Sequence, residues 1–371
     1  MDDHGECAAG RRPLAVPDEV MRLMKWKRVE AHKVAFNQIL VGLLLLLACS
    51  FGVRAQAAVS HIESVGFTVS DMDRAVDFYT RVLPFKKTSD TEVWGTEVET
   101  LSGVFGARVR VVRLQLGGET LELTEYMTPQ GRPIPVTSRS HDRWFQHIAI
   151  VVSNLDRAYK NLRRHKVRYA STAPQTLPAH LKPAAGIKAF YFKDADHHVL
   201  ELIEYPPDKG ARKWHELAKG KNKLFLGIDH TAIVVDDTQK SLEFYRDLLQ
   251  MKVSGESENY GTEQEHLNNV RGARLRITSL QTPQTGIGVE LLQYLAPDDG
   301  KPFPQDTQAN DLWHWQTSFV SAGLNGLVTV LERQKVNFIS SGIVDIEAKS
   351  LALKKGALVR DPDGHAVRVI E

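Results

Sequence analysis

The hydrophobic pattern between residues 61 and 125 predicts one strand, one helix and three further strands. The run Val65 to Val69 is short and apolar, which is typical of a strand. The next segment, 71–83, carries apolar side chains at spacings of three and four residues, which predicts an amphipathic helix. Three β-rich runs then predict half-buried strands: 91–94, 109–114 and 120–124. The segment therefore has the order βαβββ.

The same pattern recurs along the chain. Residues 66–71 align with 232–237, 166 positions further on, and the offset stays between 166 and 169 to the end of the sequence. Each half contains the pattern twice. The segment 145–152, in the middle of the first half, resembles 228–235, with which the second half begins. Four modules thus begin near four residues: His61, Trp144, Gly227 and Trp313. We expect an α+β fold of four βαβββ modules paired into two half-open barrels.

The repeat also predicts the domain plan. Modules that are adjacent in the sequence are expected to pair, which gives a first domain over 58–208 and a second over 225–371. The stretch 209–224 is rich in Lys and Gly and is interpreted as the linker.

The first 57 residues have the features of an export signal. The apolar run 39–53 is short for a membrane span, which needs about 20 residues. Basic residues precede it, and Ala55-Gln56-Ala57 offers small side chains at a cleavage position. An uncleaved anchor, or a lipoprotein modified at Cys49, remains an alternative. In each case the body is expected to be periplasmic, secreted or anchored outside the cytoplasm.

Composition narrows the choice of partners. The formal net charge of the 371-residue chain is only +2, and no basic run interleaved with aromatic residues occurs, which argues against nucleic-acid binding. Cys7 and Cys49 are the two cysteines of the sequence, so the body has no disulfide, thiolate zinc site or cysteine nucleophile. The expected partner is a small molecule, membrane contact is expected only through the N-terminal segment, and the oligomeric state stays open.

Several motifs resemble the vicinal oxygen chelate superfamily, which includes glyoxalase I, extradiol dioxygenases, methylmalonyl-CoA epimerase and bleomycin-resistance proteins. The resemblance covers nearly all of 61–371 and rests on three groups of residues: His230 with Val235-Asp236-Asp237 and Phe244-Tyr245; Asp361-Pro362-Asp363-Gly364-His365; and Asp194 with Leu200-Glu201-Leu202. It implies funnel-like sheets whose metal ligands come from the opening and final strands of each module. The fold alone does not define the reaction, because it hosts several chemistries.

In the first domain the resemblance implies that the four ligand positions are Ser64, Glu122, His147 and Glu201. Serine is a poor ligand, so we expect a metal held by His147, Glu201 and Glu122, which leaves positions open for substrate. The neighbouring Glu63 is expected to face away, because side chains alternate along a strand.

In the second domain the implied positions are His230, Glu290, Gln316 and Arg368. His230, Glu290 and Gln316 form a second candidate metal set, but arginine cannot ligate a metal. Arg368 is therefore expected to pair with Glu290 or to bind an anionic group of the substrate. His314 is interpreted as facing outward, and the turn at His197-His198 as exposed.

Imidazole and carboxylate ligands suit divalent Fe, Mn, Zn, Ni or Co, which would act as a Lewis acid on two substrate oxygens. A ring-cleaving dioxygenase usually needs two His and one carboxylate, and neither expected domain has that set. A lyase or isomerase acting on a small oxygenated substrate is therefore favoured, with Glu122 as general base. The alternative is a metal-free binding or sequestering protein of the bleomycin-resistance type, and a third possibility is a structural domain without a ligand.

Overall fold

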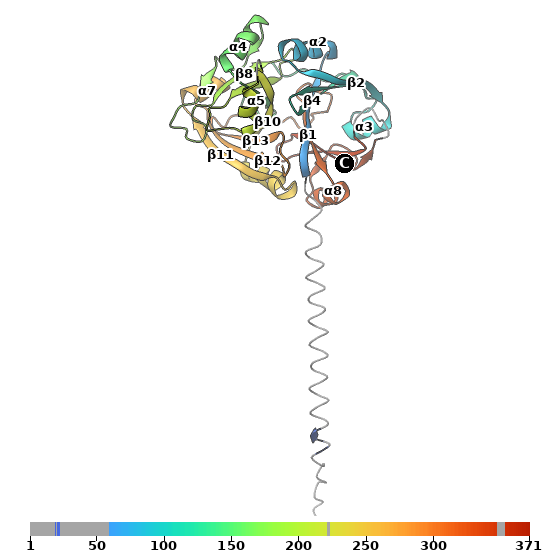
Figure 1. Ribbon diagram of the computed structural model, residues 1–371. Coiled ribbons are helices and arrows are strands. Elements are labelled where there is room, and N and C mark those ends of the chain that lie inside the picture. Colours follow the sequence, from blue (N-terminus) through green and yellow to red (C-terminus); the bar gives the residue numbers. More distant parts are fainter. Residues whose placement is uncertain (1–18, 20, 23–58, 221–222, 347–352) are drawn as a thin grey trace, which may run out of the picture. The chain divides into compact units, whose positions relative to one another are not determined.

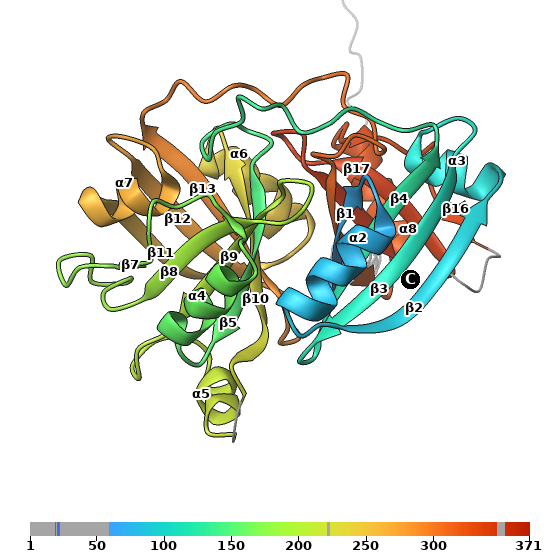
Figure 2. The same cartoon turned by 90° about the horizontal axis from the view of Figure 1, so that it is seen from above.

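The computed structural model describes residues 59–220, 223–346 and 353–371, together with 19, 21 and 22. The expected leader, 1–57, lies outside this part of the chain except for those three residues. None of the helices in the described part is long and apolar enough to cross a membrane. Two nine-stranded sheets form the body (Figures 1 and 2).

The four predicted modules are present, and the α+β architecture is confirmed. The first contains β1 (Val59–Val69), α2 (Met72–Asp77) with the π-helical turn η1 (Phe78–Val82), β2 (Lys86–Trp94), α3 (Thr96–Ser102), β3 (Arg108–Leu116) and β4 (Glu119–Thr128). The second contains β5 (Gln146–Val152), α4 (Leu155–Arg164), β6 (Arg168–Tyr169), β7 (Gln175–Thr176), β8 (Lys188–Lys193) and β9 (Val199–Glu204).

The second half of the chain repeats this order after α5 (Arg212–Ala218). The third module contains β10 (Phe225–Val235), α6 (Thr238–Leu242) with η2 (Glu243–Leu248), β11 (Lys252–Tyr260), α7 (Thr262–Asn268), β12 (Arg274–Gln281) and β13 (Gly288–Ala296). The fourth contains β14 (Trp315–Ser321), α8 (Leu324–Arg333), β15 (Asn337–Phe338), β16 (Val344–Asp345), β17 (Lys355–Arg360) and β18 (Ala366–Ile370). The short helices α3 and α7 are additions that the hydrophobic pattern did not predict.

The pairing of the modules differs from the expected one. One sheet has the order β15-β17-β18-β14-β1-β4-β3-β2, so it joins the first module to the fourth; we call it sheet A. The other has the order β11-β12-β13-β10-β5-β9-β8-β6 and joins the second module to the third; we call it sheet B. The prediction that neighbouring modules share a sheet is therefore wrong. Each seam is an antiparallel pair of opening strands, β1 with β14 and β5 with β10.

Two long connections make this exchange possible. Residues 129–145 and 297–314 carry the chain from one sheet to the other, and Figure 2 shows both running between the two sheets. The connections touch through glycines at equivalent places. A Cβ on Gly131 would lie 2.0 Å from the carbonyl oxygen of Asn310, and one on Gly300 would lie 1.9 Å from that of His141. Any larger residue at either position would collide with the opposite backbone, so these glycines permit the crossing.

Strand alternation divides each sheet into two faces. In β5, Ile148, Ile150 and Val152 join the main hydrophobic core, which also takes the apolar sides of helices from all four modules. Ala149 lies on the opposite face of the strand, and the alternation of side chains places His147 on that face with it. This face of sheet B carries the candidate site.

Candidate metal centre

Two histidines reach the same point in sheet B from strands that are far apart in the sequence. His147 lies on β5 and His230 on β10, and these strands are hydrogen-bonded neighbours with His230 opposite Ala149 and His147 opposite Ala232. A register shift between Ile228 and His230 marks a β-bulge at Asp229. Without a bulge, Ile228 and His230 would point to the same face of the strand. The extra residue reverses the direction of the side chains that follow, so Ile228 faces the main core while the imidazole of His230 lies beside His147 and Glu201.

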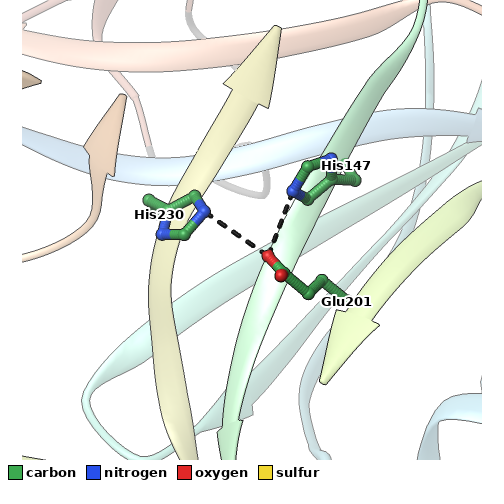
Figure 3. A group of neighbouring side chains, drawn as sticks. All are labelled: His147, Glu201 and His230. Atoms are coloured by element: carbon green, nitrogen blue, oxygen red, sulfur yellow. Dashed lines mark hydrogen bonds and ion pairs between the residues drawn. The ribbon is translucent and has the colours of Figure 1, made fainter. Parts of the chain in front are cut away.

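Glu201, on the final strand β9 of the second module, lies between the two imidazoles (Figure 3). Its Oε2 is 3.2 Å from Nε2 of His147 and 3.6 Å from Nε2 of His230. One ligand atom from each of the three residues fits within 4.8 Å of the others, and all three side chains are buried. This spacing allows the three groups to share one ion.

Glu290, on β13, adds a second carboxylate. Its Oε2 lies 3.3 Å from Nε2 of His230, and its Oε1 accepts a hydrogen bond of 2.7 Å from the hydroxyl of Ser279. The side chain of Glu290 is 23% exposed whereas that of Glu201 is 6% exposed, so Glu290 is the more accessible carboxylate of the two. The four groups come from the opening and final strands of the second and third modules.

The imidazole of His230 is held from behind by Asp229. Oδ2 of Asp229 lies 2.9 Å from Nδ1 of His230 and also accepts from the hydroxyl of Tyr205 at 2.9 Å. Oδ1 accepts from the indole of Trp214, on α5, at 2.5 Å. A carboxylate on the far nitrogen fixes the tautomer and orientation of a ligating histidine. The linker helix therefore helps to position one ligand, while Nδ1 of His147 is buried without a hydrogen-bond partner.

The electrostatics of this cluster favour a cation. Burial by itself would raise the pKa of Glu201, but His147 and His230 outweigh it and hold that pKa below its usual value. Burial disfavours the charged form of His230, yet Glu290, Asp229 and Glu201 together raise its pKa well above the usual value. Among the residues that the structure describes, no lysine or arginine forms an ion pair with Glu201 or Glu290. Two imidazole nitrogens and two carboxylates that lack a fixed cation are a donor set that fits Fe, Mn, Zn, Ni or Co as divalent ions.

A cavity of about 790 Å³ opens in front of Glu201, His230 and Glu290. Its wall combines apolar residues with hydroxyl and amide groups, and its rim includes the linker residues 209–213. One amide oxygen, Oδ1 of Asn259, is buried in this wall without a partner. A cavity of this size, with a few fixed polar groups, is typical of small-molecule sites.

The first candidate set from the sequence is divided between the two sheets. His147 and Glu201 lie in sheet B, but Glu122 lies on β4 of sheet A, and its Oε1 receives a hydrogen bond of 2.8 Å from Arg368. The expected grouping of Glu122 with His147 and Glu201 is therefore wrong. The cause is the exchange of modules, which replaces Glu122 in this group by its repeat counterpart Glu290.

The second set is divided in the same way. His230 and Glu290 lie in sheet B, whereas Gln316 and Arg368 lie in sheet A, where Nε2 of Gln316 is 3.4 Å from Glu122. Arg368 pairs with Glu122 and not, as expected, with Glu290. Arg368 is buried and already bonded to Glu122 and Ser318, so the expected role in binding an anionic substrate group is not supported.

Sheet A thus contains a second polar cluster at the equivalent place: Ser64, Glu122, Gln316 and Arg368. Ser64 is fully buried and its hydroxyl has no partner. Glu63 was expected to face away, but a register shift beside it brings it into an ion pair with Arg113, whose Nη1 lies 3.8 Å from Glu122. The same kind of bulge that places Asp229 beside His230 therefore places Glu63 beside this cluster.

Two other histidine predictions need correction. His314 is 3% exposed and therefore does not face outward as expected. Burial and nearby Arg360 lower the pKa of His314 to about 3, so its ring is neutral. In the turn, His197 is exposed as expected, but His198 is buried between Asp194 and the carbonyl oxygen of Leu312. His198 therefore has a structural role between the sheets.

The paired βαβββ modules and a polar site built from opening and final strands define a glyoxalase-like protein. The family model described as "Glyoxalase/Bleomycin resistance protein/Dioxygenase superfamily" matches residues 59–202 and again 227–369. The chain belongs to this superfamily, as the resemblance predicted, and it contains the domain twice.

Known relatives agree with this assignment. The chain is 33% identical over 166 residues to a 2-epi-5-epi-valiolone epimerase from an Actinomyces species, an alignment that covers 42% of this chain and 83% of that protein. Among solved structures, glyoxalase I from Zea mays superposes with a TM-score of 0.54 at 14% identity, covering 84% of this chain and 92% of that one. A putative dioxygenase from Bacillus subtilis gives a TM-score of 0.53 at 11% identity, covering 85% and 86%. At such low identities the two structures support the fold alone.

Proposed function

We propose that this protein is a divalent-metal-dependent isomerase or epimerase that acts on a small hydroxylated carbonyl compound, with its catalytic centre in sheet B. The observation that carries the proposal is the convergence of His147, His230 and Glu201 within 4.8 Å, next to Glu290 and a cavity of about 790 Å³. The epimerase relative supports the reaction class. His147, His230, Glu201 and Glu290 would hold the metal, and the ion would supply Lewis acidity toward two chelating substrate oxygens.

Proton transfer is assigned to Glu290. It is the more exposed of the two carboxylates, and the hydroxyl of Ser279 orients one of its oxygens. Glu290 would remove a proton from the carbon beside a carbonyl, and its return to the neighbouring carbon on the same face moves the carbonyl. Inversion of the first carbon requires that a water molecule on the opposite face donates a proton to it while Glu290 keeps the proton that it removed. Glu290 takes over the base role that the sequence assigned to its repeat counterpart Glu122. Glu201 is enclosed between two imidazoles, so it would hold the metal and would not transfer a proton.

A ring-cleaving dioxygenase is the second candidate function. His147, His230 and Glu201 form a set of two His and one carboxylate, which non-haem Fe(II) oxygenases use. The argument against a dioxygenase from the sequence, that neither domain has this set, fails because the set is assembled across the two halves of the chain. Glu290 favours the isomerase, since a fourth charged group beside the metal positions reduces the room for oxygen and substrate together.

Metal analysis tests the site, and isotope exchange tests the reaction. After anaerobic purification we expect about one divalent metal per chain, lost in His147→Ala and His230→Ala. The metal-loaded protein in D2O should then introduce deuterium beside the carbonyl of a hydroxyketone. Glu290→Gln should retain at least part of the metal but lose the exchange. Oxygen uptake with a catechol, without exchange, would replace the isomerase by the dioxygenase.

If the protein is a metal-free binding protein, it should contain no stoichiometric metal. The features that favoured it in the sequence, Ser64 and Arg368, both lie in sheet A and do not contact the cluster in sheet B. If the purified protein contains no stoichiometric metal, and none binds on addition of Fe, Mn, Zn, Ni or Co salts, the enzyme proposal is rejected in favour of a binder.

A further inference from the structure

A second, smaller cavity of about 190 Å³ lies between the two sheets, apart from the carboxylate–imidazole cluster. Trp144 and Phe145 line it from the start of the second module, and Trp313 and Trp315 line it from the start of the fourth. Lys193, at the end of β8, also lines it, as does Arg139, which is bonded to Asp299. For comparison, an apolar protein cavity of roughly 150 Å³ accepts benzene. The volume therefore suits one planar ring with a small substituent.

The internal repeat shows how this space arises. Ile134 and Lys193 of this wall correspond, at offsets of 169 and 167, to Phe303 and Arg360 in the other half of the chain. There, the guanidinium of Arg360 lies 5.7 Å from the ring centre of Phe303. Arg360 also donates to the carbonyl oxygens of Gly364 and Thr307, which ties the connection 297–314 to β17. The smaller Ile134 and the shorter Lys193 replace this packed and bonded pair.

Lys193 differs from Arg360 in its bonding as well as in its size. Within the described residues the Lys193 ammonium forms no hydrogen bond or ion pair, although it is half-buried. The acids nearest in sequence are engaged elsewhere: Asp194 with Tyr79 and His198, and Asp196 with Arg74. A half-buried cation without an anion is costly. Arg168, the cross-strand neighbour of Lys193, is itself a cation, and it donates to His197.

We propose that the cavity formed by Trp144, Phe145, Trp313, Trp315 and Lys193 is a second ligand site that takes a small aromatic carboxylate. The ring lies among the indole and phenyl groups, and the carboxylate accepts from the Lys193 ammonium. Aromatic side chains supply contact area and preferred ring geometries, while the ammonium supplies a charge-assisted hydrogen bond. None of the metal-centre residues lines this cavity, although the ring of Phe145 packs against that of His147 with 5.6 Å between the ring centres.

Calorimetry and tryptophan fluorescence on the full chain test this site, with benzoate as the probe. Benzoate should bind saturably and change the tryptophan emission. Two matched compounds separate the contributions: benzyl alcohol has the ring without the charge, and acetate has the charge without the ring. Both should bind at least about tenfold more weakly, since each loses one of the two interactions.

Two variants locate the binding. Lys193→Met keeps the length and removes the charge; it should weaken benzoate about tenfold and leave benzyl alcohol unchanged. Ile134→Phe copies the residue of the other half and should weaken both compounds by filling the cavity. Lys160→Met, on the exposed side of α4, is the control and should bind as the unmodified chain does. Circular dichroism and metal content confirm that each variant is folded.

Three results would overturn the proposal: no saturable benzoate binding, equal binding in Lys193→Met, or equal binding of benzyl alcohol and benzoate by the unmodified chain. Loss of binding in Glu290→Gln would also overturn it, because the ligand would then occupy the metal centre. A protein without metal that still binds benzoate leaves the second site intact while rejecting the enzyme.

Discussion

The two sheets offer an internal comparison, because the same four strand positions meet in each. Sheet B places His147, Glu201, His230 and Glu290 there. Sheet A places Gln316, Arg368, Ser64 and Glu122 at the corresponding positions. The difference shows that one scaffold can carry either a cluster whose side chains could hold a metal ion or a closed ion pair, depending on four side chains.

Charge balance explains why only one of the two clusters fits a cation. In sheet A, Glu122 and Glu63 are matched by Arg368 and Arg113. In sheet B, the residue equivalent to Arg113 is Ser279, a neutral hydroxyl. Among the described residues, the possible cations that Glu290 and Glu201 contact are imidazoles alone. Sheet A therefore supplies its own cations, whereas sheet B has negative charge that an external ion can neutralise.

Loss of a metal ligand in sheet B should give the largest effect. His230→Ala should reduce metal affinity by more than the roughly 10- to 100-fold that loss of a supporting residue costs, and should abolish turnover. Gln316→Ala, at the position of sheet A that corresponds to His147, is the control and should keep both metal affinity and turnover. Elemental analysis and metal titration measure the effect. Equal metal loss in the two variants would contradict the assignment of the centre to sheet B.

Breaking the ion pair of sheet A should affect stability rather than chemistry. Arg368→Met leaves Glu122 buried without its closest partner and should lower the free energy of unfolding by about 3 kcal/mol. This is the lower end of the usual range, because Arg113 remains 3.8 Å from Glu122. Urea unfolding measures the change. The double variant Arg368→Met/Glu122→Gln should recover part of the loss, and no recovery would mean that packing, not charge, is responsible.

Substitution of the residues at the two β-bulges should have an effect of intermediate size on metal affinity in sheet B and none in sheet A. Asp229→Asn should weaken metal binding by about 10- to 100-fold, since His230 loses the carboxylate that fixes its tautomer. Glu63→Gln, at the equivalent bulge of sheet A, should leave metal affinity unchanged. Titration with a competing chelator compares the two. A similar loss in both variants would show that the bulges act on folding rather than on the ligand.

The smallest expected effect concerns Ser279. Ser279→Ala removes one hydrogen bond to Glu290, worth about 1 kcal/mol, and should slow turnover about fivefold with unchanged metal content. Ser279→Thr keeps a hydroxyl and should restore most of the rate. Steady-state kinetics on the metal-loaded variants provide the measurement. Unchanged turnover in the alanine variant would remove Ser279 from the catalytic arrangement.

The repeated pattern of the sequence identified the modules and most of the chemical groups. The periodicity of 71–83 predicted the helical segment that the structure shows as α2 and η1. The resemblance to the vicinal oxygen chelate superfamily, and not the periodicity, implied that His147, Glu201, His230 and Glu290 occupy ligand positions. The supporting residues were missed. Trp214 and Tyr205 lie in no recognisable motif. Asp229 is adjacent to His230 in the sequence, but in a regular strand neighbouring side chains point to opposite faces, and the bulge that brings them together is not visible in a hydrophobic pattern.

The sequence by itself determined that four βαβββ modules exist and which of their positions carry polar side chains, since periodicity and internal repetition are local properties. Which modules share a sheet was decided only in three dimensions. The opening strands of the four modules are alike, so each has a hydrophobic face and an edge that could pair with any of the others. Which pairs form depends on where the crossing connections 129–145 and 297–314 can pass. That choice unites two histidines from different halves of the chain and separates Glu122 from both of them.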